Sequence, residues 1–507
     1  MAGEAPEGNH ETDALSVAVT ALLLGVFTQS VLRWTKVPYS VLLLLWGLAI
    51  GIGNDTYVKN WQHVSPGITF WQVIDPHLLT SLFLPPVLFA GAYALPRRIL
   101  IRNASHIALL GGVAVLTGTA MTALAARYAL PYGWTWPQAL LFGAIAAATD
   151  PVAAVTLLKE VNAPEDMRVT VDGEALVDDG VAAVLFIVFQ GYTEGLAQSA
   201  GGVFALLCRQ SLGGPAVGLA FALCLLGWLR GVPAARQEPV LAAVLMLVAA
   251  YGCFFVSDEI LATNGILAVV TLGMVCACFG PKPDAAWQGA RTCSDKTLTE
   301  QIDTIWAAVE FVANTVIFVV CGMLIAGRMY RAHQPGGPWT LQARDYAFAV
   351  ALWLLLLVIR CINIALLWPI LARTGDGITL TSAVLTAWSG LRGIVGLALA
   401  LYVLLDPGIG NAAYRSQAFF FMSTTLVLTV VVQGSLYGPL LMALGVGESS
   451  LRVDETGGLE GDGGRAQSGG RSLSHQPRRP EGEIVAEKCS GLVEMSGSRL
   501  NGVASRC

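Results

Sequence analysis

The sequence predicts an all-α polytopic membrane protein. Of the 507 residues, 55% are hydrophobic and only 13% are charged, whereas soluble domains carry about 25% charged residues. Apolar runs recur from residue 14 to residue 446, and crossing a bilayer takes about 20 such residues in a helix. Because helices satisfy their own backbone polar groups in lipid, the chain is expected to cross a membrane many times as a helical bundle.

Thirteen apolar runs can be counted, and each is expected to form one membrane-spanning helix. They are residues 14–34, 38–53, 77–95, 105–126, 137–158, 169–192, 211–229, 239–257, 262–279, 303–327, 346–372, 379–404 and 416–445. The second run is short. Residues 202–210 are expected to form an interfacial helix before the seventh run.

Basic residues predict the orientation, because cytoplasmic loops carry an excess of Lys and Arg. With the N-terminus outside, the cytoplasmic loops hold Arg33, Lys36, Arg97, Arg98, Arg102, Lys159, Arg168, Arg230, Arg236, Lys282, Arg291, Lys296 and Arg373. The external loops then hold fewer basic residues: Lys59, Arg127, Arg328, Arg331, Arg344 and Arg415. We therefore expect an extracellular N-terminus and a cytosolic C-terminus.

Two polar segments flank the predicted transmembrane domain, residues 14–446. Residues 1–13 contain no Lys or Arg, unlike signal and transit peptides, and are expected to be an extracellular N-terminal segment. Residues 447–507 are rich in Gly, Ser, Arg and Glu and too poor in aliphatic side chains to bury a core. They are expected to be a disordered cytosolic tail, which either has no specific role or binds a regulatory partner.

The run 137–158 contains an acid and a proline near its centre, in Thr149-Asp150-Pro151. A carboxylate at the bilayer midplane costs about 2.5–3.5 kcal/mol by insertion scales, and intramembrane acids are usually functional. Pro151 removes a backbone donor, so the helix should break there. The Thr149 hydroxyl and the Asp150 carboxylate could then face a cavity, as in transporters with discontinuous helices. The alternative is an ordinary proline kink with Asp150 bound to a neighbouring helix.

The next run carries a denser acidic cluster, Glu174, Asp178 and Asp179. Glu174 and Asp178 are four residues apart and share one helix face, whereas Asp179 lies about 100° further round. Crowded carboxylates in a low-dielectric site cannot all ionise freely. One of them could therefore hold either a proton or an alkali cation, and competition for one carboxylate is a simple basis for ion exchange. The alternative is a purely structural cluster, which would need enough basic partners.

Two arginines, Arg360 and Arg392, lie deep within predicted spans. Arg360 is surrounded by apolar residues and must be paired, because an unpaired buried charge is costly; Glu174 is the candidate partner. Arg392 lies among small residues at 389–393, where the helix can unwind, and it could neutralise the C-terminal ends of facing half-helices. For both arginines, a structural role and direct ion contact remain open.

Glu310 and Asn314 form a further polar pair inside an apolar run. They are four residues apart and therefore share one helix face. They could support the residues that bind an ion, or they could form a polar clamp between helices. The clamp is the preferred interpretation.

These motifs resemble those of the monovalent cation/proton antiporters, a family that includes animal Na⁺/H⁺ exchangers and their bacterial relatives. The chain is most similar to the plant salt-overly-sensitive type of plasma-membrane Na⁺/H⁺ antiporter. The resemblance is carried by VPY at 37–39, HLLTSLFLPPVLFAGAYAL at 77–95, ATDPVAAVTLLKE at 148–160, GEALVDDG at 173–180, GILAVVTLGM at 265–274, EFVANTVIF at 310–318 and SGLRG at 389–393. These strings occur in that order between residues 37 and 393, and the resemblance spans nearly all of residues 15–446.

The resemblance implies a specific architecture. It consists of thirteen transmembrane helices built as six-helix inverted repeats, with a core domain and a dimerisation domain. Two discontinuous helices cross in the core, and here they would contain residues 149–151 and 389–393. Members of the family are usually homodimers whose core moves like an elevator against the dimer scaffold.

The resemblance also implies roles for individual residues. Asp179 would be the essential carboxylate that binds the ion and the proton. Asp150 would support it across the crossing, with Thr149 as a further Na⁺ ligand. Matching positions suggest an ion pair between Glu174 and Arg360.

The resemblance also implies a structural role for Arg392.

One departure from the family pattern concerns the transported charge. Electroneutral members usually carry Asn then Asp where this chain has Asp178 and Asp179, and adjacent Asp pairs are typical of electrogenic relatives that move two protons per Na⁺. Those relatives often use a Lys partner, whereas this chain keeps Glu174 and Arg360. One-for-one electroneutral exchange is therefore expected, with electrogenic exchange as the alternative.

The predicted function is secondary active exchange of Na⁺, or of K⁺ or Li⁺, for H⁺. Asp179 would bind a proton and the cation in turn, assisted by Asp150, Asp178 and Thr149. No enzymatic activity, cofactor or nucleic acid is expected; the expected partners are alkali cations, protons, lipids and a second copy of the chain. A cation channel and a non-transporting sensor are alternatives from other classes. The resemblance implies a plasma-membrane location and a role in pH regulation and salt tolerance.

Overall fold

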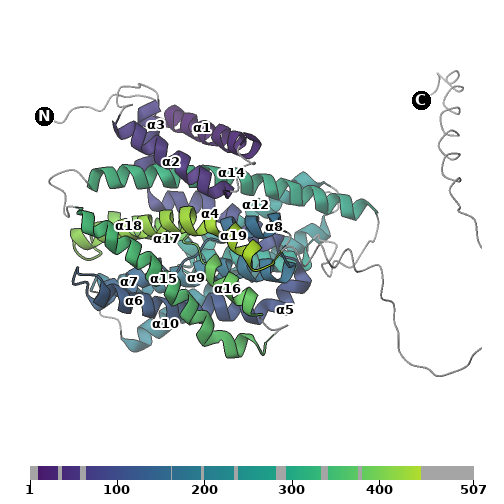
Figure 1. Cartoon of the computed structure of the whole chain (residues 1–507). Helices are drawn as coiled ribbons and strands as arrows, with labels where there is room; N and C mark the ends of the chain where they lie inside the picture. The colour runs from purple at the N-terminus through teal and green to yellow at the C-terminus, as the bar shows by residue number, and fades with distance from the viewer. Residues whose placement is uncertain are drawn as a thin grey trace, which may run out of the picture. The chain divides into compact units, whose positions relative to one another are not determined.

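The chain folds into helices that follow the predicted apolar runs (Figure 1). The computed structural model describes residues 10–31, 37–56, 64–161, 163–195, 199–232, 238–280, 293–332, 341–374 and 379–446. These residues all lie in one compact unit, Met1–Glu455. The predicted tail 447–507 and the first nine residues of the predicted extracellular segment lie outside the described residues.

In the first half of the chain, one long helix contains a π-helical turn and another is interrupted by a non-helical break. In order, the elements are α1 (His10–Val31), α2 (Tyr39–Thr56), α3 (Val64–Val73), α4 (Pro76–Ala94), α5 (Arg97–Ala108), the π-helical turn η2 (Leu109–Ala114), α6 (Val115–Ala129), α7 (Trp136–Ile145), α8 (Val152–Glu160) and α9 (Glu165–Thr193). The turn η2 joins α5 to α6, whereas α7 and α8 are separated by a non-helical break.

The second half also contains π-helical turns and a helix interrupted by a break. It contains α10 (Ala200–Gly231), α12 (Pro239–Phe255), η3 (Val256–Ile260), α13 (Gly265–Phe279), α14 (Cys293–Ala332), α15 (Ala343–Leu371), α16 (Leu380–Ser389), α17 (Ile394–Leu405), α18 (Ala412–Leu428), η4 (Thr429–Gln433) and α19 (Gly434–Ala443). Here α16 and α17 are separated by a break, and η4 joins α18 to α19.

The all-helical prediction is confirmed for the described residues, whose only β-type pairing is one isolated bridge. Eight of their helical segments are long and apolar enough to cross a membrane, and five shorter apolar helices accompany them. The count of thirteen spans and the inverted repeats stay predictions. Two details were wrong: helix α3 was missed, and residues 202–210 belong to the uninterrupted α10 instead of a separate interfacial helix.

Local sequence signals explain where two of the central helices begin. At α4, Asp75 accepts a hydrogen bond from the backbone N–H of His77 (2.8 Å), and Pro76 occupies the first turn, where its missing N–H costs nothing. At α13, Asn264 accepts from the N–H of Leu267 and donates to the carbonyl of Gly180 in α9, both at 2.9 Å. The cap of α13 thereby also fixes α9 directly after the acidic cluster.

A close crossing of α2 and α14 depends on two glycines. A Cβ at Gly47 would lie 2.2 Å from the carbonyl oxygen of Val319, and a Cβ at Gly322 would lie 2.5 Å from that of Leu44. Small residues allow helix backbones to approach in membranes, where van der Waals packing is the main source of helix association. The sequence therefore fixes this crossing through glycine.

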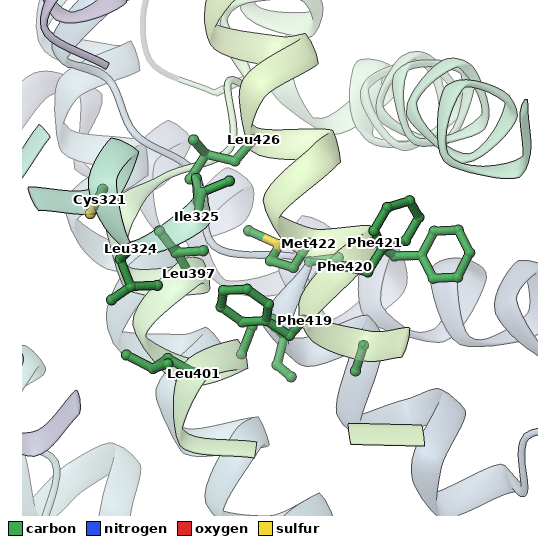
Figure 2. Packing of buried hydrophobic residues seen from close by; sticks show 14 of the residues in the cluster. Cys321, Leu324, Ile325, Leu397, Leu401, Phe419, Phe420, Phe421, Met422 and Leu426 are labelled. Carbon is green, nitrogen blue, oxygen red and sulfur yellow. The ribbon is translucent and has the colours of Figure 1, made fainter. Parts of the chain in front are cut away.

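Aromatic and aliphatic side chains fix α17 against its neighbours. Figure 2 shows Phe419 and Met422 of α18 beside Leu397 of α17, with Leu324 of α14 on the other side. All four residues are at most 4% exposed. Because interiors pack densely, this cluster positions the second half of a broken helix at the centre of the molecule.

We expect Gly322→Ala to destabilise the protein. The added methyl group would meet backbone atoms of α2 that cannot rotate away, and overpacking of this kind costs about 1–3 kcal/mol. The measurement is the apparent melting temperature of the purified protein in detergent, followed by tryptophan fluorescence.

A matched control is Gly227→Ala in α10, where an added Cβ would meet no atom within 4 Å. Alanine is the better helix former by about 0.5–1 kcal/mol, so this variant should melt no earlier than the wild type. Equal melting temperatures for the two variants would contradict the close crossing.

Candidate functional site

The two broken helices meet at their breaks. The backbone N–H of Asp150 donates to the carbonyl of Leu391 (2.8 Å), and Thr149 forms an isolated antiparallel bridge with Arg392. The first break lies between α7 and α8, and the second between α16 and α17. Peptide groups that leave the helical pattern therefore satisfy each other, as required of backbone at membrane depth.

The residues at the first break explain its geometry. Pro151 has no N–H to offer, and the Asp150 carboxylate accepts from the N–H of Val152 (2.9 Å), the first of the backbone donors of α8 that lack a partner within the helix. Across the gap, a Cβ at Gly393 would lie 2.8 Å from the Cβ of Asp150. Glycine is therefore required for the two breaks to approach this closely.

Arg392 places its charge at the end of α7. Its guanidinium Nη1 donates to the carbonyl of Ala147 (3.3 Å), and its backbone N–H donates to the Thr429 hydroxyl (3.2 Å) in η4. The side chain is 7% exposed. A buried cation at this position compensates the partial negative charge of unpaired carbonyls at a helix C-terminus.

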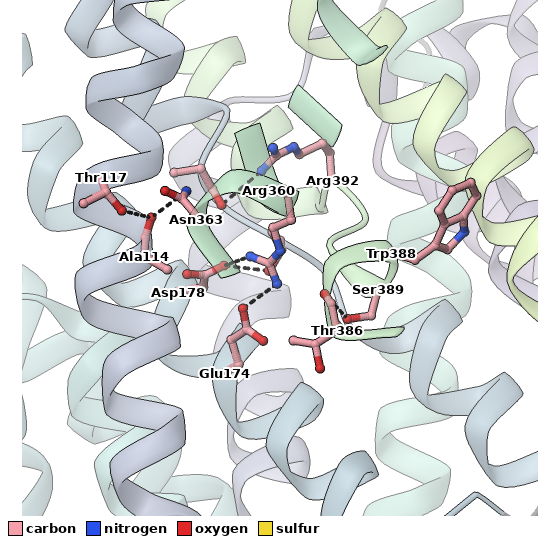
Figure 3. A network of polar contacts seen from close by, with 12 residues as sticks. Ala114, Thr117, Glu174, Asp178, Arg360, Asn363, Thr386, Trp388, Ser389 and Arg392 are labelled. Carbon is pink, nitrogen blue, oxygen red and sulfur yellow. Dashed lines mark hydrogen bonds and ion pairs between the residues drawn. The ribbon is translucent and has the colours of Figure 1, made fainter. Parts of the chain in front are cut away.

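Asp178 lies on the side of α9 that faces α15. Its carboxylate accepts from the Thr149 hydroxyl (2.7 Å) and lies 3.9 Å from the Arg360 guanidinium. Arg360 also forms an ion pair with Glu174 (Figure 3). Asp178 and Glu174 are at most 1% exposed. Two buried carboxylates therefore share one guanidinium, and Thr149 adds a hydrogen bond.

Asp179, the next residue, faces a different environment. It lines a cavity of about 70 Å³ together with Asp150. Asp179 is 8% exposed, and its Oδ1 has no hydrogen-bond partner. Successive side chains on a helix are rotated by about 100°. Asp178 therefore faces the polar network, whereas Asp179 faces the cavity.

The cavity lies between two groups of helices. Asp150, Pro151, Asp172 and Asp179 approach from the first broken helix and α9, with Gly393 from the second break. The wall that α4 and α14 contribute consists of Phe83, Leu84, Val87, Leu88, Gly91, Glu310, Asn314 and Ile317. The wall is thus apolar except for one carboxylate and one amide.

The predicted site residues therefore separate into two sets. Thr149, Asp178, Glu174, Arg360 and Arg392 form a connected polar network. Asp150, Pro151, Asp179, Glu310 and Asn314 line the cavity instead. The hydroxyl of Thr149, predicted as a Na⁺ ligand, donates to Asp178.

Sequence analysis missed Asp172, which also lines the cavity. A signal was available, because Asp172 is seven residues from Asp179. That spacing is two helical turns, which returns a side chain to the same face.

Comparison with known proteins identifies the family. Residues 18–443 match the family described as sodium/hydrogen exchanger, transmembrane. The chain belongs to this family. It is 32% identical over 427 residues to sodium/hydrogen exchanger 8 of Arabidopsis thaliana, covering 83% of this chain and 54% of that protein. It is 28% identical to the Na⁺/H⁺ antiporter ApNhaP of Aphanothece halophytica, covering 89% and 78% of the two chains.

The chain thus spans about half the length of the Arabidopsis relative. A solved structure also shares the fold: the sodium proton antiporter MjNhaP1 from Methanocaldococcus jannaschii, with a TM-score of 0.66 at 22% identity. That match covers 86% of this chain and 99% of the archaeal one. The predicted family is confirmed.

We expect Arg360→Met to be strongly destabilising. It would leave Glu174 and Asp178 buried without their shared cation, and breaking a buried pair in this way costs about 3–5 kcal/mol. The double variant Glu174→Gln/Arg360→Met removes one of the stranded charges and should recover part of the loss. Thermal unfolding in detergent measures both.

Arg344→Met on the same helix is the matched control. Arg344 is 65% exposed and lies 3.9 Å from the buried Asp345. Asp345 also accepts hydrogen bonds from the Tyr132 hydroxyl and the Gln342 N–H, so losing the exposed arginine should cost no more than about 1 kcal/mol. An Arg360→Met protein as stable as the Arg344→Met protein would show that the buried network is not held by its guanidinium.

Proposed function

We propose that the protein is a secondary active antiporter that exchanges Na⁺ for H⁺, with Asp179 as the shared binding site. The observation that carries the proposal is a carboxylate that is 8% exposed, has an unpartnered Oδ1 and lines a cavity. Membership of the sodium/hydrogen exchanger family and the relatives named as Na⁺/H⁺ antiporters support the same function. K⁺ and Li⁺ are alternative substrates.

The chemistry of competition follows from burial. An ionised carboxylate in a low-dielectric site is costly unless it is paired. Among the described residues that line the cavity with Asp179, none is basic, so in this proposal neutralisation comes from a bound proton or a bound cation. Either one excludes the other, because one charge is enough to neutralise the group. Coupled exchange requires this mutual exclusion.

The second acid of the pair has a different role in this proposal. Glu174 and Asp178 share Arg360, and Arg392 is a second positive charge that acts on Asp178. With these two cations and the hydrogen bond from Thr149, the charge of Asp178 does not need to be neutralised from solution. We therefore propose that Asp178 stays ionised through the cycle and that exchange is electroneutral, one H⁺ for one Na⁺. Adjacent acids then do not imply two transported protons.

Alternating access is proposed to occur at the boundary between the two groups of helices. Asp150 and Asp179 belong to α9 and the first break, whereas the opposite wall belongs to α4 and α14. A sliding movement of the first group along that largely apolar wall would carry the carboxylates from one side of the membrane to the other. From membership of the sodium/hydrogen exchanger family, we further propose a homodimeric, elevator-like antiporter in the plasma membrane that regulates pH and Na⁺.

Asp179→Asn tests the shared site. In proteoliposomes containing a pH-sensitive dye, we expect a Na⁺ gradient to drive proton movement through the wild type and not through the variant, because an amide neither ionises nor exchanges a proton. Asp166→Asn, an exposed acid at the start of the same helix, is the control and should remain active. Exchange by Asp179→Asn at the wild-type rate would disprove the proposal.

Voltage dependence tests the stoichiometry. With the membrane potential clamped at opposite values by K⁺ and valinomycin, the wild-type exchange rate should be the same, because electroneutral exchange moves no net charge. Asp178→Asn should also exchange without voltage dependence. Wild-type exchange that follows the voltage, and loses that dependence in Asp178→Asn, would instead support transport of two protons through the pair.

A further inference from the structure

Two polar residues interrupt the wall that faces the transport carboxylate. Among the described residues that α4 and α14 contribute to the cavity, Glu310 and Asn314 alone have polar side chains. They occupy one face of α14, four residues apart, which corresponds to about 6 Å along the helix. A polar strip on α14 therefore faces Asp179 across the cavity.

Asn314 has an unused ligand atom. Its side chain is 7% exposed, and its Oδ1 has no hydrogen-bond partner. A buried carbonyl without a partner is costly and uncommon in native proteins. Neutral amide oxygens of this kind suit hard cations.

Glu310 has an acidic neighbour on the opposite side of the cavity. Asp172 of α9 lines the same cavity, and the charges of the two carboxylates interact, with Lys159 as the cation near both. Lys159 is exposed. Arg168 is also near Asp172, but it pairs with Glu165 at 3.5 Å. Two acids thus line one cavity, and the bases near them are the exposed Lys159 and an arginine that already pairs with Glu165.

We propose that Glu310, Asn314 and Asp172 form an outer cation site that supplies Na⁺ to Asp179. Both carboxylates are less deeply buried than Asp179, and Asp172 lies two helical turns away from it, about 10 Å along α9. The inference rests on the proposed function, because it assigns the route by which the same cation reaches the exchange site.

The outer site would raise the local concentration of Na⁺ and pass the ion on to Asp179. Clefts lined by one sign of charge raise the local concentration of the opposite ion, and rings of acidic side chains do this in cation channels. The ligands come from α9 on one side and from α14 on the other. A cation held between them would therefore have a ligand on each of the two helix groups between which movement is proposed.

The first experiment measures Na⁺ dependence in proteoliposomes of the full chain. We expect Glu310→Gln to raise the Na⁺ concentration for half-maximal exchange by about 3- to 10-fold, the effect of removing one partly solvated charge. The maximal rate should fall less, because Asp179 is intact. Glu310→Asp keeps the charge and should lie between Glu310→Gln and the wild type.

Glu300→Gln is the matched control, because Glu300 is an exposed acid on the same helix. It should leave the half-maximal concentration unchanged. If Glu310→Gln gives the same value as this control, the outer site is disproved. Should Glu310→Gln fail to fold, Asp172→Asn and Asn314→Ala test the same site from other positions, and each should raise the half-maximal concentration.

The second experiment separates this inference from the proposed function. Binding of radioactive Na⁺ is measured in detergent for Asp179→Asn and for Asp179→Asn/Glu310→Gln. An outer site predicts weak residual binding to the first protein and its loss in the second. Identical binding by both proteins would disprove the outer site, even if wild-type exchange is intact. If the wild type showed no exchange but Na⁺ binding to Asp179→Asn still depended on Glu310, the proposed function would be disproved and the outer site would not.

Discussion

The structure depends on one constraint, which is that interrupted backbone deep in a membrane protein must find partners outside its own helix. The two breaks satisfy this requirement for each other through the bond from Asp150 to Leu391 and the bridge between Thr149 and Arg392. Each break alone would expose several unsatisfied peptide groups. Paired, they bring the Asp150 carboxylate to the centre of the molecule, and the Arg392 guanidinium compensates the freed carbonyls.

Asp178 and Asp179 are adjacent on α9 but face different surroundings. Asp178 faces Arg360 and the Thr149 hydroxyl, whereas Asp179 faces the cavity. In the proposed mechanism, the same chemical group is compensated by arginine at one position and neutralised from solution at the next. This separation requires a regular helix at this point, and the bond from Asn264 to the carbonyl of Gly180 fixes α9 there.

Much of this organisation could be predicted, because its causes are local. Pro151 predicted the break, and spacing placed Glu174 and Asp178 on one face, where both meet Arg360. Which residues share the cavity could not be predicted, because that depends on how α14 lies against α9. Periodicity gives the relative direction of side chains on one helix but not their partners on another. Glu310 was therefore interpreted as part of a clamp.

The size of the cavity limits how the proposed cation can be held. A volume of about 70 Å³ leaves room for several water molecules, because one water needs about 10–15 Å³ by this measure. One oxygen of Asp150 accepts from the N–H of Val152, so Asp150 has one oxygen without that bond to offer to an ion at Asp179. The ion must therefore keep part of its water shell. Discrimination among alkali ions then depends on the cost of partial dehydration, balanced against one strong carboxylate, and not on a rigid cage of protein ligands.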